Sequence, residues 1–98
     1  MTRTKPERLS PKAIDSQLAQ LVGWHRTPAG IERELEFPDF IHAFGFMTQV
    51  ALMAQARDHH PDWRNVYGRV WITLTTHEAG GITERDLALA REIASLSS

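Results

Sequence analysis

Val70-Trp71-Ile72-Thr73-Leu74-Thr75-Thr76 is a run rich in β-branched and aromatic residues, and it is the clearest strand signal in the chain. Successive side chains of a strand point to opposite faces, so Val70, Ile72 and Leu74 share one face. The other face carries Trp71, Thr73 and Thr75, and His77 follows in phase with them. We therefore expect a strand from about Tyr67 to Thr76 with one face on a hydrophobic core.

The first third of the chain predicts a helix and a hairpin. Ser10 followed by Pro11 is typical of a helix start, because serine caps free amides and proline lacks only an N–H that the first turn does not use. An apolar stripe after them predicts a short helix that ends near Gly23. Residues 24–26 and the alternating residues 31–37 predict an antiparallel pair of strands.

The middle of the chain predicts a long helix. Asp39 can cap a helix that runs to about Asp58. The apolar stripe that follows helical spacing comprises Phe40, Ala43, Phe44, Met47, Ala51 and Ala54. Outside that stripe lie Ile41, Phe46, Val50 and Met53, so the apolar sector is wider than one contact with a sheet requires. We expect a second helical surface, such as another subunit, to cover the excess.

A final helix is expected after the break at Gly80-Gly81. Thr83, with Asp86 three residues later, resembles a capping box, and the helix should continue to about Ser95. With one or two strands between the two later helices, the pattern predicts an α+β fold with helices on one face of an antiparallel sheet. Residues 1–8 are expected to form a disordered tail, and residues 9–98 a single domain.

Composition excludes several classes of protein. A chain of 98 residues with 42% hydrophobic and 23% charged content is typical of one globular domain. The formal net charge is −1, so the chain lacks the excess of basic residues that binds phosphate groups, and we do not expect nucleic acid as a direct ligand. The sequence has no cysteine, no secretory signal and no run of roughly 20 apolar residues that could span a membrane. We therefore expect a cytoplasmic protein.

Three of the five histidines lie at the two ends of the nineteen residues from His59 to His77, which contain the predicted strand. His59 and His60 follow the long helix, and Pro61 favours extended backbone there, so the two rings should point in different directions. His77, after the strand, can return to the same edge. Imidazoles exchange protons near neutral pH, so this set suits general acid–base catalysis.

Two other interpretations of the histidines stay open at this point. Histidines near helix ends often contact only the terminal carbonyl groups. Three histidines can also hold a catalytic zinc ion, although adjacent histidines seldom converge on one tetrahedral site.

Nearly the whole domain, from Ser10 onward, resembles the pterin-4a-carbinolamine dehydratase family, and the second half of the chain does so most specifically. The resemblance rests on His59-His60-Pro61-Asp62-Trp63, Val66-Tyr67, Leu74-Thr75-Thr76-His77, Gly80-Gly81-Ile82-Thr83 and Asp86. It implies a four-stranded antiparallel sheet with helices on one face, in α-β-β-α-β-β-α order. It also implies assembly as a homodimer or homotetramer.

The resemblance implies an enzyme, a lyase that converts 4a-hydroxytetrahydrobiopterin to quinonoid dihydropterin and water without a metal or organic cofactor. Such an enzyme supports recycling of the pterin cofactor of aromatic amino-acid hydroxylases. By the same resemblance, His59 and His77 carry the proton transfers. The substrate-binding residues would be His60, Pro61, Trp63 and Asp86.

Two further expectations accompany the resemblance. Some relatives stabilise dimers of a transcription factor, so the alternative function is a non-catalytic module that binds a partner protein. Several relatives carry glutamate where this chain has Gln55. If that carboxylate favours a protonated histidine, the activity of this chain should lie at lower pH than in a glutamate-bearing relative.

Overall fold

The run from Val70 supplies most of β4 (Arg69–Leu74), a central strand of a four-stranded antiparallel sheet in which the order is β1-β2-β4-β3. The structure is a computed structural model that describes residues 6–96. Val70, Ile72 and Leu74 are all fully buried, which confirms the predicted face. The strand is shorter than expected because Tyr67 and Gly68 form the turn that joins it to β3 (Asp62–Val66).

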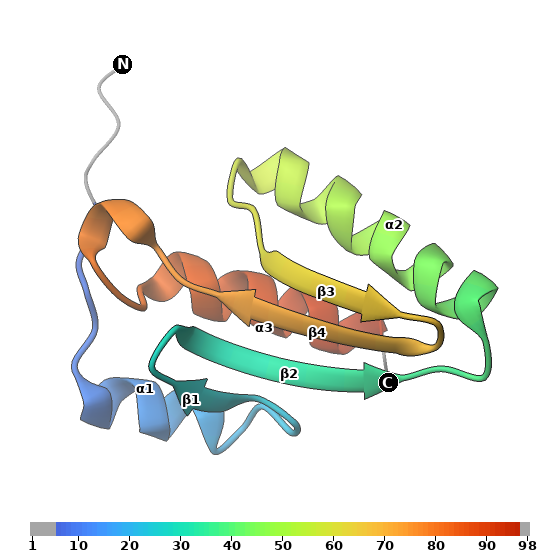
Figure 1. Ribbon diagram of the computed structural model, residues 1–98. Coiled ribbons are helices and arrows are strands. Elements are labelled where there is room, and N and C mark those ends of the chain that lie inside the picture. Colours follow the sequence, from blue (N-terminus) through green and yellow to red (C-terminus); the bar gives the residue numbers. More distant parts are fainter. Residues whose placement is uncertain (1–5, 97–98) are drawn as a thin grey trace.

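The other elements confirm the α+β fold and the predicted order (Figure 1). The expected hairpin consists of β1 (His25–Thr27) and β2 (Gly30–Glu36), and β2 also pairs with β4 from Ile31 opposite Leu74 to Glu36 opposite Arg69. The helices are α1 (Pro11–Leu18), α2 (Phe40–Arg57) and α3 (Glu84–Leu96), and a 3₁₀ turn, η1 (His77–Ala79), follows β4.

The predicted caps begin all three helices. Ser10 accepts a hydrogen bond from the N–H of Ala13, and Asp39 accepts one from the N–H of His42 at 2.8 Å. The backbone bond from His42, reinforced by one from its side chain, lowers the pKa of Asp39. At α3, the N–H of Thr83 donates to Asp86 Oδ2 and the hydroxyl of Thr83 accepts from the N–H of Arg85, which completes the capping box.

The hydrophobic core lies between the sheet and the two longer helices. Helix α3 lies behind the sheet in the view of Figure 1, and its Leu87, Leu89, Ala90 and Ile93 are fully buried in the same cluster as the inward face of β4. Helix α2 contacts both α3 and β4, so both helices cover one face of the sheet. This arrangement brings the end of α2, the end of β4 and the start of α3 to one edge of the molecule.

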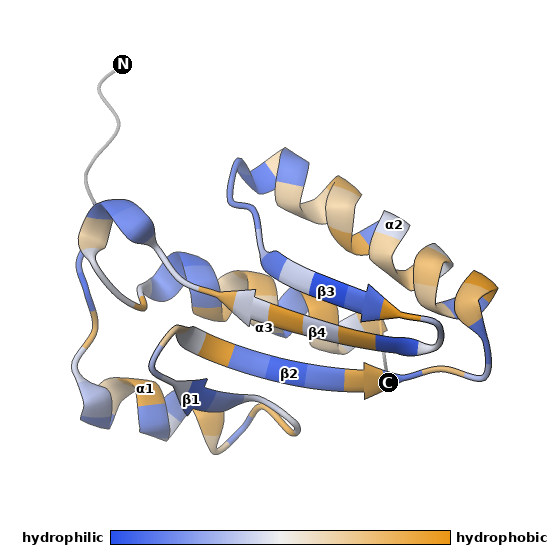
Figure 2. Cartoon of the chain, in the orientation of Figure 1, coloured by the Kyte–Doolittle hydropathy of each residue, from blue (hydrophilic) through white to orange (hydrophobic). Residues whose placement is uncertain are grey.

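The predicted inward stripe of α2 is partly wrong. Ala43 and Ala54 are buried as expected, but Phe46 and Val50, which lie outside the predicted stripe, also belong to the core. Phe40, Phe44 and Ala51 are exposed instead. Apolar residues occupy most of the helix surface (Figure 2), so periodicity alone does not define which face packs inward. The face is set by packing against β4 and α3.

The chain before α1 runs along the connection between η1 and α3. The N–H of Leu9 donates to the carbonyl of Ile82 at 2.8 Å, and the side chain of Arg8 lies against Gly81. The prediction of a disordered tail falls mostly on residues 1–5, outside the described residues. Within residues 6–96, no helix is long and apolar enough to cross a membrane.

Candidate active site

The end of α2 sends its two following histidines in different directions. Asp58 takes a left-handed conformation, with φ 51° and ψ 41°, and the N–H of His59 then donates to the carbonyl of Ala54. This ending turns His59 inward, where only 9% of its surface is exposed, and leaves His60 exposed. His60 Nε2 lies 3.0 Å from Oε1 of Gln55, one turn back on α2.

A buried carboxylate supports His59. Asp86 is fully buried in the first turn of α3, and its Oδ1 lies 2.5 Å from Nε2 of His59. Its Oδ2 accepts from the hydroxyl of Thr76 at 2.8 Å and from the N–H of Thr83 at 2.9 Å. An ionised carboxylate only accepts hydrogen bonds, so His59 Nε2 is the donor in this pair. A buried charge with this many donors is well compensated.

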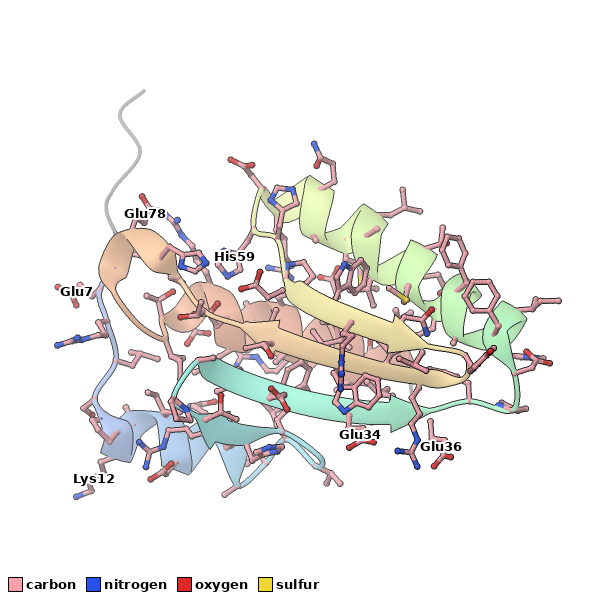
Figure 3. The ribbon with its side chains drawn as sticks, in the orientation of Figure 1. Glu7, Lys12, Glu34, Glu36, His59 and Glu78 are labelled. Atoms are coloured by element: carbon pink, nitrogen blue, oxygen red, sulfur yellow. The ribbon has the colours of Figure 1, made fainter. Side chains whose placement is uncertain are left out.

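The other ring nitrogen of His59, Nδ1, is not involved in the contact with Asp86. No residue in the described part of the chain hydrogen-bonds to His59 Nδ1. The ring lines a pocket of about 270 Å³ that is formed by His59, His60, Thr75, Thr76, His77 and Glu78. Figure 3 shows His59 at the edge of the sheet, below the turn that carries Glu78. The pocket therefore holds all three histidines that the sequence singled out.

His77 contrasts with His59 in its surroundings. Its side chain is 85% exposed, and its Nε2 lies 3.9 Å from Oδ2 of Asp62 at the start of β3. The position of His77 is set where β4 ends. The backbone of Thr76 pairs with that of Gly81, and η1 begins at the next residue, His77. The pocket thus combines one buried, oriented imidazole with one exposed imidazole.

Not all predicted site residues lie on this pocket. Pro61 and Trp63 are absent from its lining; Trp63 packs against the hydrophobic core and borders a separate pocket on the sheet. Asp86 lies behind His59, so it reaches the pocket only through that ring.

Sequence reasoning missed the part played by Thr76. This residue continues the inward set of Val70, Ile72 and Leu74, and only 2% of its surface is exposed. A hydroxyl at the end of an otherwise apolar inward face was the available signal, since a buried polar group requires a partner.

Metal ligation finds no support in the geometry. Among residues 6–96, no three histidine, aspartate or glutamate side chains are grouped so that they could hold a metal ion. The Nε2 atom of His59 is already bonded to Asp86.

The chain is an α+β domain in which three histidines line one pocket at an edge of the sheet, and comparison with known proteins identifies its family. The family model described as pterin 4 alpha carbinolamine dehydratase matches residues 7–96. The chain belongs to this family, whose members are lyases.

Individual relatives agree with this assignment. A candidate pterin-4-alpha-carbinolamine dehydratase of Rhizobium johnstonii is 52% identical, over 89% of this chain and 88% of the relative. One of Paraburkholderia xenovorans is 50% identical, over 93% of this chain and 97% of the relative. The crystal structure of a transcriptional coactivator/pterin dehydratase from Brucella melitensis has a TM-score of 0.90 and 41% identity, and the match covers 94% of this chain and all of that one.

The contact between Gln55 and His60 refines the prediction about pH. Gln55→Glu would place a carboxylate beside His60 and favour its charged form, so we expect the pH profile of kcat/KM to move toward higher pH. The shift should be on the order of a few tenths of a pH unit, because the pair is exposed and screened. Profiles of the native protein and the variant, measured side by side, check this; superimposable profiles would contradict it.

Proposed function

We propose that this chain catalyses the dehydration of 4a-hydroxytetrahydrobiopterin to quinonoid dihydropterin and water. The observation that carries the proposal is the convergence of His59 and His77 on one pocket in a chain of the dehydratase family. The reaction removes a proton from a ring nitrogen and breaks the bond between C4a and its hydroxyl oxygen. That oxygen takes up a proton and leaves as water, so atoms and charge balance without any redox partner.

In the proposed mechanism, His59 and His77 carry the two proton transfers. His59 acts through Nδ1, because Nε2 is bonded to Asp86. His77 reaches the reacting atoms from the exposed side of the pocket, and His60 binds the pterin ring beside them. General acid–base catalysis by positioned side chains typically contributes about 10²–10⁴-fold to a rate, and it is the main contribution that this pocket offers.

The test is a stopped-flow absorbance measurement of carbinolamine loss with and without the protein. Spontaneous dehydration supplies the baseline. We expect the native protein to increase the rate in proportion to its concentration. A rate equal to the spontaneous rate at micromolar protein would refute the proposal.

We further propose that the activity serves to recycle the pterin cofactor of aromatic amino-acid hydroxylases.

We also propose that the chain forms a homodimer or homotetramer. Its support is the exposed apolar face of α2, where Ile41 is 79% exposed, Leu52 69% and Phe44 54%. Exposed apolar patches of this kind mark association surfaces. We expect light scattering after gel filtration to give a mass of two or four chains for the native protein, and a smaller assembly for Ile41→Lys combined with Leu52→Lys. A native protein that elutes as a monomer would contradict this proposal.

A second candidate function is a binding module for a partner protein. The same exposed face of α2 favours it, as does the similarity to the Brucella melitensis protein, which is named a transcriptional coactivator as well as a dehydratase. A protein that leaves dehydration at the spontaneous rate but binds a DNA-binding partner through α2 would reverse the ranking of the two functions.

A further inference from the structure

Thr76 connects the two segments that supply the histidines. Its buried hydroxyl lies 2.8 Å from Asp86 Oδ2, and Asp86 in turn contacts His59. Its backbone N–H donates to the carbonyl of Gly81, and its own carbonyl accepts from the N–H groups of Ala79 and Gly81. His77 is the next residue in the chain, so the position of Thr76 also determines the position of the His77 backbone.

The directions of the hydrogen bonds around Thr76 are determined by elementary chemistry. The carboxylate of Asp86 can only accept, so the single hydroxyl proton of Thr76 is directed at Oδ2. The hydroxyl of Thr83, 2.8 Å from that of Thr76, must then donate to it, while accepting from the N–H of Arg85. The chain of donors therefore runs from Arg85 through Thr83 and Thr76 to Asp86.

This chain of donors holds the carboxylate of Asp86 in one orientation, and the carboxylate in turn sets the tautomer of His59. With Oδ2 occupied by Thr76 and by the N–H of Thr83, the carboxylate presents Oδ1 to His59 Nε2. The proton of a neutral His59 ring then resides on Nε2, and the lone pair on Nδ1. Buried networks in which every member is satisfied hold their side chains in one arrangement.

We infer that Thr76 is a positioning residue for the proposed dehydration: its hydroxyl orients Asp86 and thereby holds His59 with the proton on Nε2 and with Nδ1 available to the pocket. Thr76 acts through Asp86 and does not itself exchange a proton with the substrate. This inference rests on the proposed function for its kinetic consequence, but the tautomer of His59 can be measured independently of activity.

The kinetic test compares three variants. Thr76→Val keeps the shape of the side chain and removes the hydroxyl, so we expect kcat to fall about tenfold or more while KM stays within about twofold. Thr76→Ser keeps the hydroxyl and should restore most of kcat. Thr73→Val is the matched control: it removes a bond from a threonine hydroxyl to the carboxylate of Glu32 on the same strand pair, outside the histidine pocket, and should leave both constants unchanged.

The second measurement is the ¹⁵N spectrum of the histidine rings. In the native protein we expect His59 as the Nε2–H tautomer near neutral pH. In Thr76→Val the carboxylate of Asp86 loses the hydroxyl that orients it and can turn away from Nε2, so we expect a mixture of tautomers. A native His59 that carries its proton on Nδ1 would overturn the inference even if Thr76→Val failed to fold. Native kcat in Thr76→Val, or an equal loss in Thr76→Ser, would overturn it too. A protein without dehydratase activity but with the expected tautomers would refute only the proposed function.

Discussion

His77→Ala should reduce the rate of catalysed carbinolamine loss about 10²-fold or more while leaving the melting temperature within about one degree of the native value. The side chain of His77 is 85% exposed, and its closest polar contact in the described chain is the 3.9 Å approach to Asp62. Truncation therefore removes a proton carrier without removing packing. Stopped-flow rates and thermal melting of the same preparation check both parts.

His59 requires a different substitution for the same test. His59→Ala would leave Asp86 Oδ1 without its donor, and an uncompensated buried charge costs about 3–5 kcal/mol of stability. His59→Gln is the sharper change, because the amide nitrogen can donate to Asp86 from nearly the position of Nε2 but cannot exchange protons near neutral pH. We expect a loss of activity as large as that of His77→Ala, with the fold retained.

The control for both variants is His25→Ala, which removes an exposed histidine of β1 that lies outside the pocket. It should retain full activity. Native activity in either His59→Gln or His77→Ala would contradict the proposed roles, and equal losses in all three variants would show that the assay reports general damage.

The local rules of the sequence predicted most of the fold. Alternation placed Val70, Ile72 and Leu74 in the core, and the caps at Ser10, Asp39 and Thr83 are all present. These features depend on residues a few positions apart, whose geometry is set by the backbone of a single element.

The inward face of α2 was not predictable in the same way, because apolar residues surround most of this helix. Phe46 packs against Phe37, which precedes α2, and their ring centroids lie 5.0 Å apart. The spacing of apolar residues along the helix cannot predict such a contact with another segment. The choice between the Phe46 face and the Phe44 face was made by tertiary packing. The sequence did indicate that apolar surface would remain exposed.

The candidate site was also predicted only in part. The sequence pattern predicted that Asp86 caps a helix, and it does. The same carboxylate also contacts His59, 27 residues earlier in the chain. One residue therefore serves the local structure through Oδ2 and the site through Oδ1. Local pattern reveals only the first role. The resemblance to the family placed Asp86 among the substrate-binding residues and did not indicate its contact with His59.

Gly30→Ala should destabilise the fold by about 3 kcal/mol or more. Gly30 has a φ of 146°, which side chains rarely adopt, and a Cβ built there would lie 2.2 Å from the carbonyl oxygen of Leu74. That oxygen belongs to the backbone of β4, so it cannot move aside without separating β2 from β4 at the centre of the sheet. The substitution would therefore separate β2 from β4, the two central strands of the sheet.

The matched control is Gly45→Ala on α2, where a Cβ would meet nothing within 4 Å. Alanine is favoured over glycine in an exposed helix by about 1 kcal/mol, so this variant should raise the melting temperature. For a domain of this size, each kcal/mol corresponds to roughly 4–8 °C, so the two glycine-to-alanine changes should move the melting temperature in opposite directions, with Gly30→Ala lower by about 12 °C or more. A Gly30→Ala protein that melts with the native one would show that β2 and β4 can separate locally at little cost, and that the edge holding the histidines is less rigid than the structure indicates.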